Sequence, residues 1–364
     1  MRDSVAVAPW GEGALLLDLE ERRLHELNAS ARVVWQTLAT VGFEDLVPAL
    51  QARFDVPAGR LQADVREVLG SFDRAGLLTD GGAQGGTTGD RVREADAAGP
   101  LSDTAGGLGP FRAGRGSFVV TVDDPQSAVE LDRVLAPLRT DLAVGETPHR
   151  LTVATGHDRG PVVDGLVADV NALAVQTSPD CVAFHAGAVA VDGRIVMMPG
   201  VSNSGKSTLT AAMIRAGATY LTDEVALLDP CSHQLVPYPK SISLDPGSFA
   251  LLSDLCPPST DGFADHRRHK WHVDPRPLAD IASPGPIAAI VTPVHRHGAA
   301  TNIEMLEPRE AVDVLLANSF DFAAAGPAGF AALVRLAREV PVGRLVMDDL
   351  DQAVDAVVAQ LARR

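Results

Sequence analysis

Cysteine is scarce in this sequence. The 364 residues hold three cysteines, Cys181, Cys231 and Cys256, and no two of them form a C-x-x-C pair. This spacing argues against a disulfide-rich secreted scaffold and against the paired-cysteine zinc sites. We expect buried thiols of a protein in a reducing cytosol, and a disulfide or a metal role is the disfavoured alternative.

Positive charge is also in short supply. Lys and Arg total 31 against 47 Asp and Glu, which gives a formal net charge of −16. Because phosphate backbones and anionic lipid surfaces favour an excess of basic side chains, this balance argues against a general nucleic-acid or membrane-surface binder. Only a local basic patch could serve either role.

Long apolar runs are missing as well. No stretch approaches the roughly 18 apolar residues of a membrane span. The first residues, MRDSVAVAPWGEG, lack the basic start and apolar run of a signal peptide. We therefore predict a cytoplasmic protein whose partners include neither membrane nor nucleic acid.

Large apolar residues are nearly absent between about residues 80 and 113, although 46% of the whole chain is hydrophobic. This segment includes most of the run TDGGAQGGTTGDRVREADAAGPLSDTAGGLG, which is rich in Gly, Ala, Asp and Thr. Such a composition buries too little surface to offset its ordering entropy. We predict a flexible linker over 80–113 between a domain at 1–79 and a domain at 114–364.

The pattern of residues 1–79 predicts three strands followed by three helices. The short apolar or alternating runs SVAVA, ALLLDL and RRLHEL are typical of a small antiparallel sheet. Asn28 or Ser30 can cap the first helix. Two more helices are expected at about 43–54 and 58–77, which completes a winged-helix-like module.

Strands and helices are mixed along residues 114–364. GSFVVTVDD, HRLTVAT and PGPIAAIVTPV are typical of strands, PQSAVELDRVLAPL and VVDGLVADVNALAVQTS of helices, and AFHAGAVAVDGRIVMMPG of a hairpin. This mixture favours an α/β domain built on a mixed sheet.

A phosphate-binding loop is predicted at residues 200–207. GVSNSGKS matches G-x-x-x-x-G-K-[ST] at each fixed position, between an apolar run and the helix-forming series STLTAAMIRAG. This is the strand–loop–helix context that the motif requires, and it disfavours a fortuitous Gly/Ser-rich turn. Lys206 is expected to reach the β and γ phosphates and the Ser207 hydroxyl to ligate Mg²⁺. The predicted nucleotide-binding residues are Gly200, Ser202, Asn203, Ser204, Gly205, Lys206, Ser207 and Thr208.

Two carboxylates and a histidine complete the candidate site. Asp223 and Glu224 end a short strand in ATYLTDEVALL, beside the loop. One carboxylate can hold Mg²⁺ and the other can accept the proton of an incoming hydroxyl. His185, in CVAFHAGAVAV, can face the phosphates or the acceptor. An exposed acidic turn and a hydrogen-bonded core histidine are the alternatives.

Basic residues gather in the stretch DHRRHKW of an otherwise acidic protein. Arg267, Arg268 and Lys270 can clamp the triphosphate or attract an acidic peptide, and a solvated basic turn is the alternative. Three histidines in this region have a spacing compatible with metal ligation, but neighbouring proline and polar residues favour a loop instead.

The stretch FHAGAVAVDGRIVMMPGVSNSGKSTLTAAMIRAGATYLTDEVALLD (184 to 229) resembles the catalytic core of the HPr kinase/phosphorylase-related family, among the phosphoenolpyruvate-carboxykinase-like P-loop kinases. Members phosphorylate a serine of a protein or peptide with ATP and Mg²⁺. The resemblance implies that Lys206 and Ser207 bind the nucleotide. Asp223 and Glu224 match the acidic pair that serves Mg²⁺ and the acceptor hydroxyl. His185 matches the active-site histidine.

Two departures from that family narrow the prediction. The acidic pair is Asp-Glu rather than Asp-Asp, which leaves open which carboxylate is the base and which is the metal ligand. The stretch YPKSISLDPGSFALL lacks the signature of the reverse, phosphorolytic reaction. We therefore expect a kinase without phosphorylase activity.

Residues 4 to 79 resemble the PqqD-like peptide-recognition domains of ribosomal-peptide biosynthesis, on the run ALLLDLEERRLHELNASARVVWQTL. In such domains a leader peptide adds as a strand to the edge of the third strand and lies against the third helix. The residues expected to line this groove are Arg22, Leu24, Leu61, Val65, Leu69 and Phe72. A DNA-binding winged helix is the alternative, and the nearly balanced charge of the third helix disfavours it.

Together these features predict an ATP- and Mg²⁺-dependent kinase for a Ser, or a Thr, of a ribosomally synthesised precursor peptide captured through its leader. A short flexible linker would raise the local peptide concentration to the order of millimolar. Two alternatives stay open, an ATP-binding peptide chaperone without phosphoryl transfer and a small-molecule kinase. The oligomeric state is open too, a homo-oligomer included.

Overall fold

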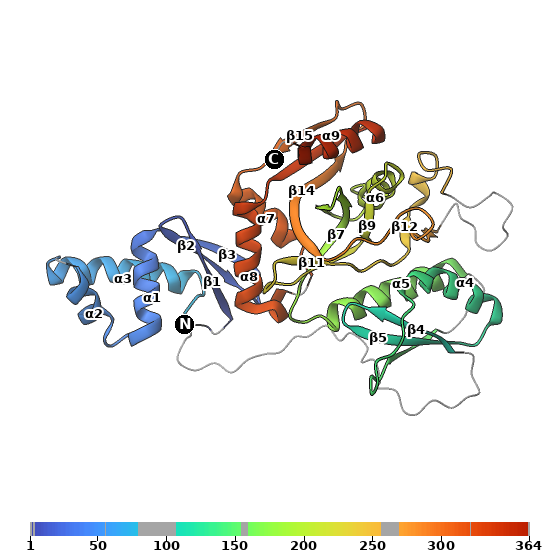
Figure 1. Ribbon diagram of the computed structural model, residues 1–364. Coiled ribbons are helices and arrows are strands. Elements are labelled where there is room, and N and C mark those ends of the chain that lie inside the picture. Colours follow the sequence, from blue (N-terminus) through green and yellow to red (C-terminus); the bar gives the residue numbers. More distant parts are fainter. Residues whose placement is uncertain are drawn as a thin grey trace. The chain divides into compact units, whose positions relative to one another are not determined.

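The computed structural model describes residues 2, 4–54, 56–78, 107–153, 159–255, 269–320 and 322–362. The chain divides into two compact units (Figure 1). The first comprises Met1–Arg91 and Phe322–Val334, and the second comprises Val92–Asp321 and Arg335–Arg364. Strands and helices alternate through most of the chain, so the fold class is α/β, as the sequence predicts.

The first unit begins with an antiparallel sheet. Its strands β1 (Val5–Trp10), β2 (Gly13–Asp18) and β3 (Arg23–Leu27) lie in that order, with β2 in the centre. The three predicted strands are therefore confirmed. Within the described ranges β3 pairs with β2 alone, so it is an edge strand of this sheet.

Three helices follow the sheet. They are α1 (Ala29–Val41), α2 (Leu46–Arg53) and α3 (Ala58–Arg74). Asn28 caps α1, because its side-chain oxygen accepts a hydrogen bond from the Ala31 N–H at 2.8 Å. The helices expected from the apolar spacing are all present.

Three residues predicted to line a leader groove belong instead to the core of this unit. Leu61, Val65 and Phe72 of α3 are buried in one cluster, and Phe72 meets Trp35 edge-on with ring centroids 5.2 Å apart. The helical spacing that singled them out marks the face that packs inward. Leu69 is only partly buried and lies at the margin of the cluster.

A three-stranded sheet opens the second unit. β4 (Gly107–Ala113) pairs antiparallel with β5 (Gly116–Val122), and β5 pairs in parallel with β6 (His149–Val153). α4 (Pro125–Leu135) connects β5 to β6, and its N-terminus is capped by the Asp124 carboxylate.

The predicted linker range, 80–113, extends too far. Its last residues form β4, because Phe111 and Ala113 supply fully buried apolar side chains in a segment otherwise rich in glycine. Residues 79–106 lie outside the described part of the chain, so the linker remains a prediction there.

An eight-stranded mixed sheet forms the centre of the second unit. Its main path runs β11-β10-β7-β8-β14-β16-β15, and β9 also pairs with β7. β14 is parallel to β8 and β16, and the other pairs are antiparallel. The strands are β7 (Val182–Val191), β8 (Arg194–Pro199), β9 (Thr219–Thr222), β10 (Val225–Leu228), β11 (Gln234–Val236), β14 (Gly285–His295), β15 (Asn302–Met305) and β16 (Val342–Met347).

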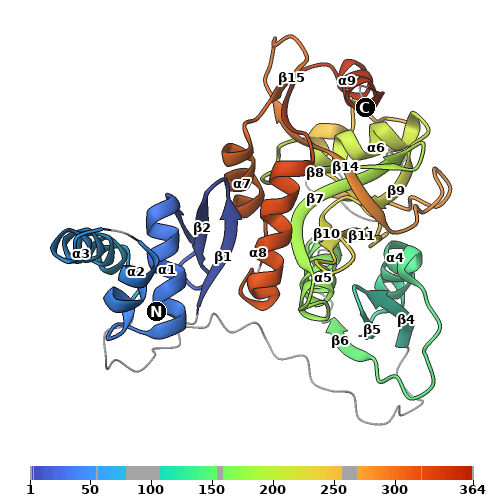
Figure 2. The ribbon, with the colours of Figure 1, turned by 60° about the vertical axis from the view of Figure 1, so that its left-hand side comes forward.

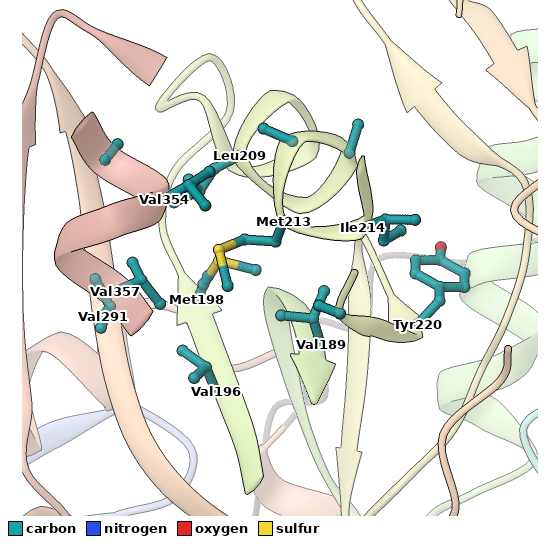
Figure 3. Close-up of a cluster of buried hydrophobic side chains, with 14 of the residues drawn as sticks. Val189, Val196, Met198, Leu209, Met213, Ile214, Tyr220, Val291, Val354 and Val357 are labelled. Carbon is teal, nitrogen blue, oxygen red and sulfur yellow. The ribbon is translucent and has the colours of Figure 1, made fainter. Parts of the chain in front are cut away.

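Helices cover this sheet. α6 (Lys206–Arg215) and α9 (Leu350–Ala362) share one apolar cluster with β8, and Figure 3 shows Leu209 and Met213 beside Met198 and Val354. α5 (Arg159–Gln176) belongs to a second cluster that joins the three-stranded sheet to β7 and β10, an arrangement visible in Figure 2. The second unit also contains α7 (Pro308–Ala317), and most of α8 (Phe322–Glu339) belongs to the first unit.

Two short strands, β12 (Ile242–Leu244) and β13 (Trp271–Val273), pair antiparallel, and a 3₁₀ turn at Pro246–Ser248 follows β12. Helix α6 contacts β12. Ile242, Leu244 and Val273 of this pair belong to the apolar cluster, whereas Ser243 and His272, which lie opposite each other, contact polar groups.

Two further expectations concern cysteine and membranes. The thiol of Cys181 is buried, as predicted, whereas Cys231 is exposed in the turn after β10, and Cys256 lies outside the described residues. Every helix in the described part of the chain is too short or too polar to cross a lipid bilayer.

Candidate active site

The predicted phosphate loop joins β8 to α6. Asn203 and Gly205 have positive φ angles of 64° and 94°, a conformation that favours glycine at 205. A Cβ on Gly200 would lie 2.7 Å from Ser204 Oγ, so a side chain at 200 would displace the loop. A Cβ on Gly205 would lie 2.8 Å from Met347 Cε, so neither glycine has room for a side chain, and the loop ends at the N-terminus of α6.

Lys206 is held inside this loop. Its Nζ donates to Gly200 O at 2.7 Å and to Val201 O at 2.9 Å. Burial lowers the pKa of Lys206 to about 8. A buried ammonium of this kind gains from an anion placed beside it.

Asp223 is the most enclosed carboxylate of the site, at 1% exposure. Its Oδ1 lies 2.7 Å from Lys240 Nζ and 3.1 Å from the Tyr220 hydroxyl. Its Oδ2 accepts from the Ser243 N–H at 2.9 Å and from Ser207 Oγ at 3.2 Å. One oxygen therefore faces the interior and the other faces the serine that follows Lys206.

Glu224 occupies a different environment from its neighbour. Its side chain is 27% exposed, and Oε2 lies 3.4 Å from Lys240 Nζ. Burial raises the pKa of Glu224, but Lys240, Lys270 and His185 together lower it below its ordinary value. Glu224 is thus an ionised carboxylate with access to the cavity.

His185 lies on β7 opposite Val225 of β10. Its ring is half-buried against Phe320, with ring centroids 5.8 Å apart. Burial and the positive charges of Lys206 and Lys270 lower the pKa of His185, so the imidazole is neutral at pH 7. It offers the site a neutral donor or acceptor rather than a cation.

A cavity of about 100 Å³ brings most of the predicted residues together. It is lined by His185, Ser202, Asn203, Gly205, Lys206, Ser207, Thr208, Asp223, Glu224, Asp245 and Lys270. Gly200 and Ser204 belong to the loop but not to this lining. Lys270 is the member of the predicted basic clamp that the structure describes, and Arg267 and Arg268 lie outside the described residues.

The histidines near this clamp are dispersed. His272 lies in β13 and contacts Ser243 and Asp164, and His266 lies outside the described residues. Across the ranges that the structure describes, no three His, Cys, Asp or Glu residues are grouped as a metal site.

A second cavity, of about 330 Å³, adjoins the loop. The two cavities share Asn203, Gly205, Thr208 and Asp245. The rest of its lining combines apolar and polar side chains: Gly247, Ser248, Leu251, His295, Met347, Asp348, Asp349 and Leu350. A ligand in the first cavity can therefore extend into a larger and less polar space.

Lys240 and Tyr220 were not predicted as site residues. Both contact Asp223, and both are buried. The run YPKSISL gives little signal for Lys240, because only its Tyr and Ile have high strand propensity. A buried lysine needs a carboxylate partner, but local sequence does not say which one.

The chain is similar to one family model and to solved structures. Residues 13–78 match the family model described as coenzyme PQQ synthesis protein D (PqqD). The solved structure of TbiB1 in complex with the TbiA(beta) leader peptide is 26% identical and covers 23% of this chain and 98% of that chain, with a TM-score of 0.21. The Hpr(Ser) kinase/phosphatase from Coxiella burnetii is 14% identical and covers 50% of this chain and 93% of that chain, with a TM-score of 0.26.

None of the curated proteins matches the chain. The predicted PqqD-like character of the N-terminal domain is confirmed over residues 13–78.

Proposed function

We propose that this protein transfers the γ-phosphoryl group of ATP to a Ser or Thr hydroxyl of a precursor peptide. One observation carries the proposal: a glycine-containing loop with a buried lysine shares its cavity with two carboxylates in different environments. Phosphoryl transfer needs cationic groups that contact the phosphates and a base that accepts one proton, and these residues can supply both.

The oxygen atoms near Ser207 fit a magnesium ion. Ser207 Oγ and Asp223 Oδ2 are 3.2 Å apart, and hydroxyl and carboxylate oxygens are ligands that Mg²⁺ prefers. When bound, Mg²⁺ neutralises charge on the phosphate oxygens. Lys206 adds a second positive charge, once its ammonium exchanges the loop carbonyls for phosphate oxygens.

Glu224 is the proposed base. Asp223 has both carboxylate oxygens engaged, whereas Glu224 is partly exposed to the cavity. In the proposed step the acceptor oxygen forms a bond to the γ phosphorus, the bond from that phosphorus to the β–γ bridging oxygen breaks, and the hydroxyl proton passes to Glu224. ADP leaves with the bridging oxygen, and neutral His185 orients the acceptor by a hydrogen bond.

The nucleoside is proposed to occupy the second cavity. A triphosphate whose γ end lies toward Glu224 leaves its α phosphate near Thr208, which lines both cavities. From there the nucleobase can pack against Leu251, Met347 and Leu350 in the larger cavity. Its carboxylates can accept hydrogen bonds from ribose hydroxyls.

The peptide nature of the substrate is supported by the N-terminal domain. Residues 13–78 match the PqqD family model, and β3 is an edge strand to which an extended peptide can add. Arg22 and Leu24 lie at the start of this edge, so they remain candidate leader contacts.

The test is a labelling experiment with the full-length protein, γ-labelled ATP, Mg²⁺ and a leader-containing precursor peptide. We expect label on a Ser or Thr of the peptide, and much less label on the same peptide without its leader. ATP consumption or binding without labelled peptide would support a chaperone instead. Equal labelling of a free hydroxyl compound would support a small-molecule kinase.

A further inference from the structure

A buried cation outside the phosphate loop contacts both carboxylates of the site. The Lys240 side chain is 4% exposed, and its Nζ lies 2.7 Å from Asp223 Oδ1 and 3.4 Å from Glu224 Oε2. The same Nζ donates to Ser241 O and to Ser243 Oγ, both at 3.0 Å. Removing a charge from water is costly unless its donors are paired, and each donor of Lys240 has a partner.

The polar contacts extend beyond Lys240. An ammonium can only donate, so Ser243 Oγ accepts from Lys240, and the same oxygen lies 3.2 Å from His272 Nδ1. His272 Nε2 in turn lies 2.9 Å from Asp164 Oδ1, so the imidazole links Ser243 to that carboxylate. These residues, Asp164, His272, Ser243 and Lys240, form the support chain.

The support chain contacts both carboxylate oxygens of Asp223. Lys240 contacts Oδ1, and the backbone N–H of Ser243 donates to Oδ2 at 2.9 Å. The carboxylate cannot turn without breaking both contacts, so Oδ2 stays 3.2 Å from Ser207 Oγ.

We propose that Lys240, oriented by Ser243, His272 and Asp164, is a positioning residue that fixes the oxygen of Asp223 facing the magnesium side of the site. This inference rests on the proposed function, because it concerns how the same site receives Mg²⁺ with its nucleotide.

An Asp–His–Ser arrangement also occurs in hydrolases, but this one does not supply a nucleophile. Ser243 is buried, and its oxygen already accepts a hydrogen bond from Lys240. The histidine contacts the serine through Nδ1 and the aspartate through Nε2, the reverse of the nitrogen roles in the serine-protease triad. The arrangement therefore orients a lysine.

Two serine variants of the full-length protein test this role. Ser243→Ala removes the hydroxyl that accepts from Lys240 but keeps the N–H that contacts Asp223. Ser241→Ala is the matched control, because its buried hydroxyl donates to Val134 O, outside the support chain. The readout is binding of a non-hydrolysable ATP analogue by calorimetry, across a Mg²⁺ titration and in EDTA, with thermal unfolding measured in parallel.

We expect Ser243→Ala to raise the Mg²⁺ concentration needed for half-maximal enhancement of binding about tenfold, the lower end of the effect of one lost hydrogen bond to a charged group. Ser241→Ala should leave this midpoint within about twofold of wild type at a similar loss of thermal stability. Binding in EDTA should be the same in all three proteins. Lys240→Met should shift the midpoint further.

Equal midpoints for the two serine variants would overturn the role of Lys240, whatever happens to stability. A wild type that binds the analogue with Mg²⁺ but labels no peptide overturns the proposed phosphoryl transfer, and the midpoints still decide the role of Lys240. A wild type without Mg²⁺-dependent binding overturns both.

Discussion

At the scale of single residues, the neighbouring carboxylates of the candidate active site have different surroundings. Asp223 is enclosed by Lys240, Tyr220 and a backbone N–H, whereas Glu224 is open to the cavity. Both residues lie in the bend between β9 (Thr219–Thr222) and β10, where the Asp223 side chain is buried and the Glu224 side chain stays partly exposed. Substitutions of the two side chains should therefore change different properties of the protein.

Glu224→Gln removes the proposed proton acceptor and keeps the side-chain size. We expect kcat for peptide phosphorylation to fall about 10²- to 10⁴-fold, the usual contribution of a positioned base, with little change in Mg²⁺-nucleotide affinity. Asp223→Asn should instead weaken the Mg²⁺-dependent part of that affinity. Steady-state kinetics and calorimetry measure the two effects, and the reverse pattern would exchange the assigned roles.

The buried Lys206 predicts a pH effect on nucleotide binding. Because its pKa is about 8, the Lys206 side chain is largely a neutral amine above pH 8. A bound triphosphate should favour the charged ammonium form. Binding should therefore take up a proton at pH 8.5 and much less at pH 6.5. Calorimetry in buffers of different ionisation enthalpy measures this uptake, and Lys206→Arg, which stays charged, should lack it.

At the scale of elements, sequence patterns locate strands and helices better than they locate partners. The strand–loop–helix around Lys206 and the three helices of the first unit are present as predicted. Leu61 and Phe72 show the limit, because helical spacing marks a buried face without telling a core from a groove. Lys240 shows the same limit for ion pairs. Its partners, Asp223 and Glu224, lie between β9 and β10, and the sequence around Lys240 does not identify them.

A substitution in the second cavity should weaken recognition of the nucleobase without affecting recognition of the phosphates. Leu251 lines it and is 56% exposed, so Leu251→Trp should narrow the cavity without disturbing the core. We expect ATP affinity to fall about tenfold, or roughly 1.4 kcal/mol, while inorganic tripolyphosphate binds as it does to wild type. Equal losses for both ligands would place the nucleoside elsewhere.

At the scale of the whole molecule, the PqqD-like domain and the proposed phosphoryl-transfer site belong to one chain. If the leader is captured by the edge of β3, a free leader peptide should compete with the precursor. We expect it to raise KM for the full precursor without changing kcat, and to leave phosphorylation of a leaderless peptide unaffected. Initial rates at several leader concentrations test this, and a fall in kcat would contradict simple competition for one docking edge.

The internal hydrogen bonds of Lys206 bear on how the protein discriminates among anions in the cell. A lysine already satisfied by the carbonyls of Gly200 and Val201 gives a single inorganic phosphate little advantage, because that ion must first replace both partners. If the loop binds a triphosphate as proposed, that ligand would meet several amide groups at once and could compensate for the exchange. Abundant free phosphate should therefore be a poor inhibitor of this protein, and the loop should select ligands by the number of phosphate groups they carry.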